Sequence, residues 1–459
     1  MTLRDKVAQL VLIATYGETL SSRSSQFRKY VHAVRDLRVG GLIVVNRVVG
    51  GTVRSAEPIA MAAFLNRMQR LAKVPLIVGA DFERGASMRV SGTTKFPHLM
   101  AYGAAGDLSL TRELGEATAR EARALGVHWV FAPVADVNNN PDNPIINIRS
   151  FGENPADVAA HVKAFIEGAQ AANQRVLLTV KHFPGHGDTS VDSHMGLPSI
   201  TADRDRMNNL ELVPFRAAIE ARVDAVMTAH LSVPAVEKEG LPSTVSKPVL
   251  TGLLRNELKF AGLIVTDAMD MQGLTKQFPG GEAAVRAIEA GADVLLMPPN
   301  PEAAIASIVD AVHHGRISAR RIDQSVNRVL AAKMRVGLQR QAIVDLDKVS
   351  DELESSDFAE QAERAAEKAV TLVKNEKTEV PLKSPEAACL FVLTESRSGL
   401  QGKKLIEEVR SRSKQMQILS LDPLISRLEI EESMAKMQNC ETSIVAAFVS
   451  VAAYRGMSH

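Results

Sequence analysis

The sequence predicts an α/β fold, a (β/α)8 TIM-type barrel followed by a smaller α/β sandwich domain. Short runs rich in β-branched residues alternate with longer amphipathic stretches, which is typical of βαβ units and a parallel sheet. Eight such units fit into roughly 300 residues, and this suits a single barrel better than two doubly wound domains. The chain has 459 residues, 46% of them apolar, which is enough material for two globular units.

Eight short apolar segments are expected to form the inner strands of the barrel, because each is bounded by turn residues. They are residues 9–14, 41–46, 75–81, 129–134, 176–182, 225–230, 263–267 and 292–297. Amphipathic segments between the strands predict the outer helices. They are residues 60–71, 108–125, 155–172, 214–221 and 282–290, with 301–314 and 319–336 closing the barrel.

The barrel is expected to occupy residues 1–338, and residues 339–357 lose periodicity and turn polar, as a linker would. Residues 358–459 then predict a second α/β domain, with a helix over 358–374 and strands over 388–394, 417–421 and 442–453. Helices are expected over 403–412 and 424–437. Three strands make a thin sandwich, so this domain is either minimal or cut short.

The composition excludes several classes of partner. Lys plus Arg (54) nearly equals Asp plus Glu (53), so the chain lacks the basic surface that nucleic acids and anionic membranes require. No apolar run approaches the roughly 20 residues that span a bilayer, and no secretory signal follows Met1, so a cytoplasmic location is expected. Aromatic residues make up only 4%, which favours a pocket for one or two sugar units over a long polysaccharide cleft.

The two cysteines, Cys389 and Cys440, both lie late in the chain. A disulfide framework is therefore not expected, both residues are expected to be buried thiols, and no Cys-based metal site can be built.

Polar residues that end apolar strands are the candidates for the site, because the active site of a parallel barrel lies at the carboxyl ends of its strands. Asp81 and Asp267 each end such a run, and Lys181 and His182 end another. A single Asp at a strand end is also a common helix N-cap, so neither Asp alone decides the function. Glu83 and Arg84 are interpreted as pairing with one another.

The richest segment is 181–194, in which three His, two Asp and a Lys lie among two Gly and a Pro. Such a loop after a barrel strand is usually functional. Asp192 and His194 are two residues apart, so on an extended backbone their side chains leave the same face and can hydrogen-bond. The carboxylate would fix the tautomer of the imidazole and raise its basicity, giving an acid/base pair.

A zinc site is the alternative interpretation of the same loop. His182, His186, Asp188, Asp192 and His194 include enough ligand types for zinc. Against it, the segment is a flexible loop after one strand, and no His-x-His motif ends an early strand. A second alternative is that the loop has only a structural role and binds neither substrate nor metal. No metal and no cofactor are expected.

At these residues the sequence resembles bacterial β-N-acetylglucosaminidases of glycoside hydrolase family 3. The similarity runs from residues 3–10 through the barrel into the second domain, and its most specific part is Lys-His-Phe-Pro-Gly-His-Gly at 181–187 with Asp-Ser-His at 192–194. Phe151-Gly152 after Arg149, and Thr266-Asp-Ala-Met269, are further matches. Asp-Ser-His separates this branch from the β-glucosidases of the family.

The resemblance implies that Asp267 is the nucleophile of a retaining glycosidase and that His194, oriented by Asp192, is its acid/base. It also implies that the non-reducing-end sugar is bound by Asp81, Arg89, Arg149, Lys181 and His182. One departure is visible. The family pattern Asp-x-Glu-Gly-Gly-Arg is replaced by Asp-Phe-Glu-Arg-Gly-Ala at 81–86, which changes the rim of the expected pocket.

The expected activity is exo-hydrolysis of a terminal β-linked N-acetylglucosamine, from cell-wall fragments or chitooligosaccharides, by double displacement. Alternatives are a family 3 β-glucosidase, an N-acetylglucosaminide phosphorylase, a metal-dependent barrel hydrolase and a non-catalytic sugar-binding protein. The expected partner is a small carbohydrate, without nucleic acid or membrane.

Overall fold

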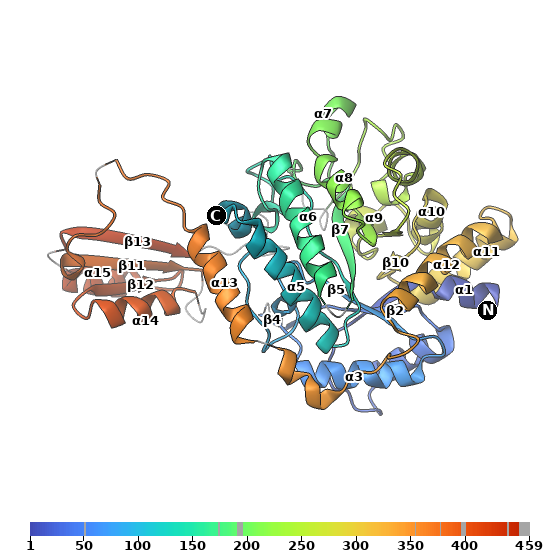
Figure 1. Ribbon diagram of the computed structural model, residues 1–459, viewed down its shortest axis with the longest axis horizontal. Coiled ribbons are helices and arrows are strands. Elements are labelled where there is room, and N and C mark those ends of the chain that lie inside the picture. The colour runs from blue at the N-terminus through green and yellow to red at the C-terminus, as the bar shows by residue number, and fades with distance from the viewer. Residues whose placement is uncertain are drawn as a thin grey trace. The chain divides into compact units, whose positions relative to one another are not determined.

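The computed structural model describes residues 1–49, 52–172, 175–190, 196–353, 355–376, 378–395, 401–437 and 440–448 (Figure 1). The chain forms two compact units, Met1–Val370 and Thr371–His459. In the described part of the chain, no helix combines the length and the apolar character needed to cross a membrane.

The first unit contains an eight-stranded parallel sheet in the order β10-β1-β2-β5-β6-β7-β8-β9. A parallel bridge between Val265 and Val294 joins the last strand to the residues before β10, so the sheet curls into a barrel. The strands are β1 (Val11–Thr15), β2 (Gly41–Val44), β5 (Ile77–Ala80), β6 (Trp129–Val130), β7 (Leu177–Phe183), β8 (Ala225–Thr228), β9 (Leu263–Val265) and β10 (Leu295–Leu296). The predicted barrel and all eight predicted strands are confirmed.

Helices surround the strands (Figure 1). The predicted ones are found as α3 (Pro58–Leu71), α5 (Leu108–Ala124), α6 (Pro155–Ala171), α8 (Val213–Glu220), α10 (Glu282–Ala290), α11 (Pro301–His313) and α12 (Ala319–Arg335). Their starts follow capping rules. Asn154 accepts the N–H groups of Ala156 and Asp157 with Pro155 in the first turn, and Asn300 caps α11 in a similar way.

Further short elements fill the connections. The helices are α1 (Leu3–Ala8), α2 (Ser25–Val31), α4 (Leu99–Ala105), α7 (Arg204–Asn209) and α9 (Gln272–Thr275), with π-helices η1 (His32–Leu37) and η5 (Pro248–Glu257). Single 3-10 turns are η2 (Ala86–Met88), η3 (Asn147–Arg149), η4 (Ser243–Val245), η6 (Leu346–Lys348) and η7 (Ser350–Glu352). A hairpin of β3 (Arg47–Val49) and β4 (Thr52–Arg54) follows β2, at the end of the barrel where the site is expected.

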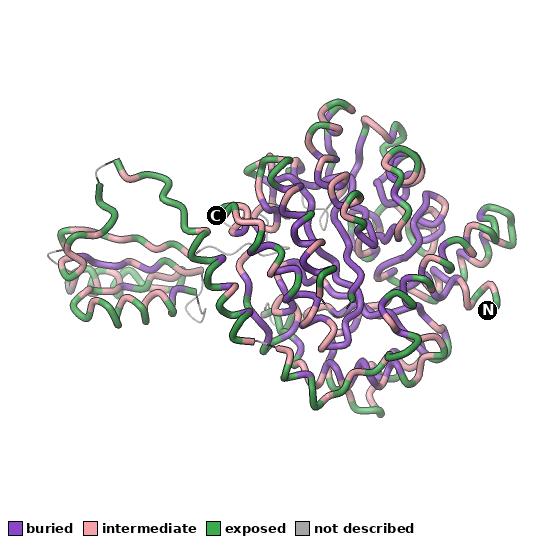
Figure 2. Tube along the Cα trace, in the orientation of Figure 1, coloured by how far each residue is buried: buried purple, intermediate pink, exposed green. Residues whose placement is uncertain are grey.

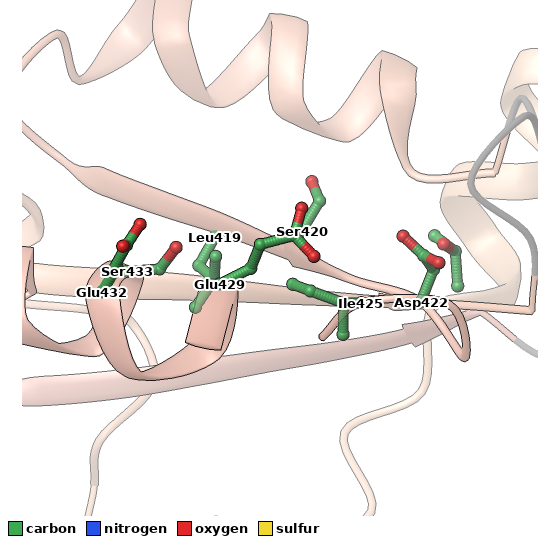
Figure 3. Close-up of a pocket in the computed structure, with 8 residues that line it drawn as sticks. Leu419, Ser420, Asp422, Ile425, Glu429, Glu432 and Ser433 are labelled. Carbon is green, nitrogen blue, oxygen red and sulfur yellow. The ribbon is translucent and has the colours of Figure 1, made fainter. Parts of the chain in front are cut away.

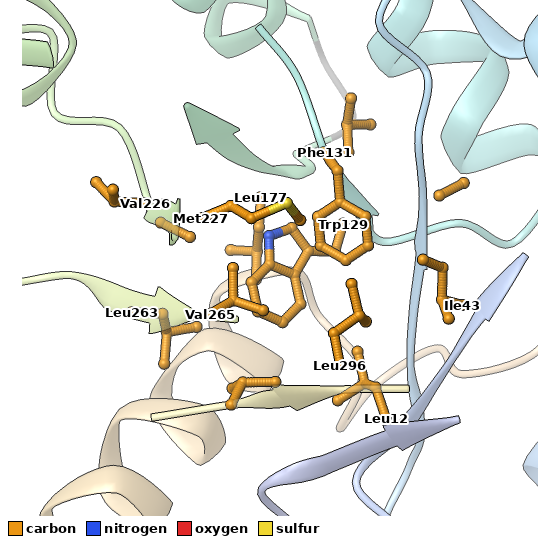
Figure 4. Close-up of a cluster of buried hydrophobic side chains, with 14 of the residues drawn as sticks. Leu12, Ile43, Trp129, Phe131, Leu177, Val226, Met227, Leu263, Val265 and Leu296 are labelled. Atoms are coloured by element: carbon orange, nitrogen blue, oxygen red, sulfur yellow. The ribbon is translucent and has the colours of Figure 1, made fainter. Parts of the chain in front are cut away.

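The barrel interior is a packed core, as Figure 4 shows. Side chains from several strands meet there, among them Leu12, Leu177, Val265 and Leu296 around Trp129. The buried indole Nε1 of Trp129 donates to Thr179 Oγ1 at 2.6 Å, so its one polar atom is satisfied. Burial is concentrated on the strands and on the inner faces of the helices, whereas the outer faces are exposed (Figure 2).

Helix α13 (Ser356–Ala369) belongs to the first unit, because it packs against α4 and α5. Its buried residues are Phe358, Ala362 and Ala365, spaced as one helical face. The compact units thus divide at Val370, later in the chain than the sequence suggests.

The second unit is a three-stranded parallel sheet in the order β12-β11-β13, from β11 (Ala388–Thr394), β12 (Gln417–Leu421) and β13 (Thr442–Phe448). The 3-10 turn η8 (Pro385–Ala387) precedes it, and α14 (Lys403–Arg412) and α15 (Arg427–Lys436) connect the strands. The expectation of two buried thiols is wrong. Cys389 and Cys440 form a disulfide with Cα atoms 5.7 Å apart, since the start of β11 and the residues before β13 lie side by side.

Candidate active site

The polar residues predicted at strand ends gather at the carboxyl end of the barrel. Asp81 follows β5, Lys181 and His182 lie in β7, and Asp267 comes two residues after β9. Since all barrel strands are parallel, their carboxyl ends face the same opening. Contacts between side chains from different strands, given below, confirm that the fold brings several of them together.

Lys181 links two carboxylates inside the barrel mouth. Its Nζ donates to Asp81 Oδ1 at 2.8 Å and lies 2.8 Å from Glu83 Oε1, and the side chain is only 2% exposed. Arg89 Nη2 donates to the other oxygen of Asp81 at 3.0 Å and Arg89 Nη1 to Asn46 Oδ1 at 3.1 Å. Three predicted sugar-binding residues, Asp81, Arg89 and Lys181, therefore form one hydrogen-bonded cluster.

The opposite charges of Asp81, Lys181 and Arg89 keep these side chains ionised. Burial by itself would raise the pKa of Asp81, but the charges of Lys181 and Arg89 outweigh it and bring the pKa down to about 2. Burial would likewise lower the pKa of Lys181, and the two neighbouring carboxylates instead raise it. The cluster thus presents fixed charges to a ligand over the ordinary pH range.

Glu83 pairs with Arg149 and not, as the sequence suggested, with Arg84. Arg149 Nε and Nη2 donate to the two carboxylate oxygens of Glu83 at 3.0 and 2.8 Å, a bidentate arrangement. Burial would raise the pKa of Glu83, but Arg149 and Lys181 hold it well below its usual value. Arg149 Nη1 also donates to the carbonyl of Ile145 at 2.9 Å. This pair joins the predicted ligand Arg149 to the Lys181 cluster.

His182 is oriented by Asp136, a residue that sequence reasoning missed. Asp136 Oδ2 lies 2.7 Å from His182 Nδ1, and Asp136 also accepts the backbone N–H of His182 and that of His186. Arg149 Nη2 lies 3.3 Å from His182 Nε2 and has only N–H groups to offer. In the neutral form of the ring, the partners therefore assign the proton to Nδ1 and leave the Nε2 lone pair toward the arginine.

The signal for Asp136 was present in the sequence. It ends the apolar run Phe131–Ala135 after a predicted strand, as Asp81 does after another. Burial would raise the pKa of Asp136, and the charge of His182 and its hydrogen bond lower it. Asp136 is completely buried, so it acts on a ligand only through His182.

Asp267 lies beside His182, His230 and Lys181, just after β9. Its Oδ1 accepts the N–H of Ala268 at 2.7 Å. Burial would raise the pKa of Asp267, but the charges of His182 and His230, the Ala268 bond and Lys181 together lower it below the ordinary value. The carboxylate is therefore ionised at neutral pH, which a nucleophile requires.

His230, at the end of the segment that contains β8, was also missed as a site residue. Its ring is buried, with Nε2 2.9 Å from the carbonyl of Ala268 and Nδ1 2.7 Å from Thr244 Oγ1. Because Ala268 follows Asp267 directly, His230 fixes the backbone that carries the carboxylate. The largely apolar run Ala225–Ala229 is followed directly by the polar residue His230, as at the other site strands.

The loop after β7 is described up to Ser190, so Asp192 and His194 lie outside the described residues. Its first half is fixed to the loop after β6. Asn143 Nδ2 donates to the carbonyl of His186 at 2.8 Å, and His186 Nδ1 lies 2.7 Å from Thr189 Oγ1. A Cβ at Gly187 would lie 1.8 Å from the carbonyl oxygen of Val137, so only glycine permits this backbone contact.

The chain that returns from this loop is fixed to the loop after β8. Ser232 N–H donates to the carbonyl of Pro198, and Ile200 N–H donates to that of Ser232. In the sheet β7 lies between β6 and β8. The described ends of the loop are thus held on both sides of the strand that carries Lys181 and His182.

The residues proposed for zinc do not assemble within the described ranges, where no group of three or more His, Cys, Asp or Glu side chains is placed to hold a metal ion. His182 and His186 have ring centroids 6.1 Å apart, edge to face. Asp188 instead pairs with Arg206, whose Nη2 lies 2.8 Å away, and accepts from Asn139.

A separate hollow lies in the second unit (Figure 3). It is found at the carboxyl end of β12 and the start of α15, and Ser420, Asp422, Glu429, Glu432 and Ser433 contribute its polar lining. None of the predicted site residues lines it. The chemistry of the chain is therefore assigned to the barrel mouth.

Comparison with known proteins agrees with this geometry. Residues 2–332, which include all eight barrel strands, match the N-terminal domain of glycosyl hydrolase family 3. The chain belongs to glycosyl hydrolase family 3. The resemblance seen in the sequence is thus confirmed.

Two relatives are about one third identical to the chain over the aligned residues. A β-N-acetylglucosaminidase/β-glucosidase of Cellulomonas fimi is 33% identical over 387 residues, which are 82% of this chain and 65% of that protein. β-Hexosaminidase A of Pseudoalteromonas piscicida is 35% identical over 323 residues, which are 63% of this chain and 54% of that protein. The chain therefore spans less than two thirds of the length of either relative.

A solved family 3 structure has the same architecture over nearly the whole chain. The β-N-acetylglucosaminidase from Paenibacillus sp. str. FPU-7 superposes with a TM-score of 0.85 and 37% identity, over 97% of this chain and 85% of that one.

Proposed function

We propose that the protein is a retaining exo-β-N-acetylglucosaminidase that removes terminal β-linked N-acetylglucosamine from small glycans. The observation that carries the proposal is Asp267, a carboxylate just after β9 whose Oδ1 accepts the N–H of Ala268 and whose pKa is lowered beside His182, His230 and Lys181. A nucleophilic carboxylate beside a hydrogen-bonding cluster is what a glycosidase of this mechanism needs. The names of the relatives support N-acetylglucosamine as the sugar.

The first step forms a covalent glycosyl-enzyme. Asp267 attacks the anomeric carbon, the bond from that carbon to the leaving oxygen breaks, and the imidazolium of His194 donates its proton to that oxygen. Asp192 orients the imidazole and stabilises its charged form. Since the acid is a cation and not a second carboxylate, it does not repel the ionised nucleophile.

The second step releases the sugar. Neutral His194 takes a proton from water, the water oxygen bonds to the anomeric carbon, and the bond to Asp267 breaks. The carboxylate and the imidazolium are restored, and two inversions give net retention.

The Lys181 cluster binds the sugar hydroxyls in this proposal. Lys181 Nζ has three N–H groups and uses two of them on Asp81 and Glu83, which leaves one for a hydroxyl. Asp81, held by Arg89 and Lys181, keeps acceptor capacity for another. His182 and Arg149, fixed by Asp136 and Glu83, complete a rigid surface that loses little entropy when sugar binds.

The substrate is tested by comparing nitrophenyl N-acetyl-β-glucosaminide with nitrophenyl β-glucoside, each with and without inorganic phosphate. We expect the N-acetylated substrate to have the larger kcat/KM and free N-acetylglucosamine to be the product in both buffers. Preference for the glucoside contradicts the sugar assignment. Phosphate-dependent release of a sugar 1-phosphate contradicts hydrolysis and supports the phosphorylase alternative.

The two catalytic roles are tested by Asp267→Asn and His194→Ala. We expect Asp267→Asn to abolish turnover with an unchanged circular dichroism spectrum, and normal activity in that variant contradicts the nucleophile. His194→Ala is expected to slow substrates with poor leaving groups far more than aryl glycosides. Equal losses for both contradict the acid role.

A further inference from the structure

Arg84 is a charged residue at the edge of the site that the proposed mechanism does not use. It stands where the family pattern has glycine, directly after Glu83. Glu83 is already engaged by Arg149 and Lys181, and among the described residues no carboxylate lies within ion-pair distance of Arg84. Its one hydrogen bond within the described chain runs from Nη1 to the carbonyl of Phe96, at 3.4 Å. Within the described chain Arg84 therefore has no ion-pair partner of its own, although the charge of the adjacent Glu83 acts on it.

Unsatisfied donors cluster around this arginine. Arg84 Nε, Ser87 Oγ and Arg89 Nε are buried and make no hydrogen bond to the described residues, although they lie within six consecutive residues. All three atoms carry a hydrogen to donate, and leaving such groups buried without an acceptor is costly. The other two nitrogens of Arg89 bind Asn46 and Asp81. Arg89 thus belongs to the sugar-binding cluster through two of its nitrogens and carries one of the unsatisfied donors on the third.

The backbone holds this turn in place. Gly85 has φ +83°, and a Cβ there would lie 2.7 Å from the ring of Phe96, so the turn is packed against the segment that leads to α4. Arg84 bonds to the same segment, in which His98 precedes α4. The imidazole of His98 makes no hydrogen bond to the described residues.

His98 is electrically coupled to the same group. Burial and, next in size, the positive charge of Arg84 together lower the pKa of His98 to about 4. Above that pH the ring is neutral and offers one N–H donor without a second positive charge.

We propose that Arg84, Ser87 and His98 form an oxyanion-binding site beside the sugar cluster, which takes a carboxylate or phosphate group of the molecule that reacts there. A guanidinium donates two parallel N–H groups to either anion, and the hydroxyl and imidazole supply further donors. This proposal rests on the proposed function. If the protein is a glycosidase, the anion is a carboxylate of an acidic glycan; free phosphate is the alternative source of the same chemistry.

The test compares two disaccharides that differ only in a carboxylate. Both have N-acetylglucosamine β-1,4-linked to the leaving sugar, which is N-acetylglucosamine in one and N-acetylmuramic acid in the other. The measured quantity is the ratio of kcat/KM for the acidic over the neutral disaccharide. Losing a charge-assisted hydrogen bond predicts a fall of about 10- to 100-fold in this ratio for Arg84→Gln.

Two further variants serve as controls. Arg84→Lys keeps the charge and is expected to retain part of the ratio, because lysine cannot form the bidentate pair. Arg54→Gln removes one positive charge from exposed β4, two residues before Ala56, which bridges to Val90. It is expected to leave the ratio within twofold, since exposed charges are screened.

The outcomes separate the sources. A fall in the disaccharide ratio for Arg84→Gln supports a glycan carboxylate. An unchanged ratio with weaker inorganic phosphate binding in calorimetry supports free phosphate as the ligand. If Arg84→Gln changes neither, the site is refuted. Binding of the acidic disaccharide to Asp267→Asn protein, with and without Arg84→Gln, tests the site even if no glycosidase activity is found.

Discussion

Asp136 Oδ2 lies 2.7 Å from His182 Nδ1, and this contact sets which nitrogen of His182 faces the barrel mouth. The same carboxylate accepts the backbone N–H groups of His182 and His186, so it also fixes the end of β7 and the start of the loop that follows. A residue of the loop after β6 thereby fixes the orientation of His182 on the next strand, β7.

Asp136→Asn is expected to lower kcat/KM about 10- to 100-fold, as is typical when the partner of a functional histidine is lost. An amide can donate to Nδ1 and so favour the tautomer with hydrogen on Nε2, which then faces the donors of Arg149. Steady-state kinetics check this. Asp142→Asn, exposed in the same loop, is the control, and equal kinetics for both variants contradict the orienting role.

Lys181→Met is expected to destabilise the barrel by about 3–5 kcal/mol, because it leaves the buried Glu83 and the partly buried Asp81 near one another without their shared cation. Urea unfolding followed by the fluorescence of buried Trp129 measures the loss. Adding Glu83→Gln removes one of the two charges and is expected to restore part of the stability. No recovery in the double variant contradicts carboxylate repulsion as the cause.

Acid is expected to destabilise the barrel in part through Asp81. Its pKa is lower in the folded protein, about 2, than the ordinary 3.8, so its contribution to the unfolding free energy is complete above pH 4 and is lost as the pH falls toward 2. The contribution is about 2 kcal/mol. Urea midpoints from pH 5 to 2 should fall less steeply for Asp81→Asn than for the native chain, and parallel curves contradict this.

The sequence was sufficient for the fold and for part of the site. Periodicity located all eight strands, because a buried strand needs an apolar run and its ends need turn residues. The chemistry at strand ends located Asp81, Lys181, His182 and Asp267. Asp136 and His230 carry a similar signal, a polar residue that follows an apolar run, but neither was predicted as a site residue.

Contacts between distant segments could not be predicted. Glu83 was assigned to its neighbour Arg84, yet it pairs with Arg149, 66 residues away. The two cysteines were interpreted as thiols because the sequence does not show that β11 and β13 are neighbours. Pairing depends on strand order, which periodicity does not specify.

Gly187→Ala is expected to disturb the loop after β7, because the added Cβ would lie 1.8 Å from the carbonyl oxygen of Val137. Val137 follows Asp136, so the clash displaces the residue that orients His182. We expect kcat/KM to fall at least tenfold with a small change in the unfolding midpoint. Gly252→Ala is the matched control, since its nearest contact would be 3.9 Å away, and equal activities in the two variants contradict the packing role.

The disulfide is expected to stabilise the second unit, whose three strands bury few side chains. Closing a loop between residues 51 apart stabilises by about 3–4.7 kcal/mol in the chain-entropy account. Cys389→Ser with Cys440→Ser should therefore expose the chain after Val370 to limited proteolysis while the barrel resists. Thiol titration of the native protein should find no free thiol before reduction and two after it. Two thiols before reduction contradict the bond and favour the reducing cytoplasm, whereas a stable bond favours an oxidising compartment.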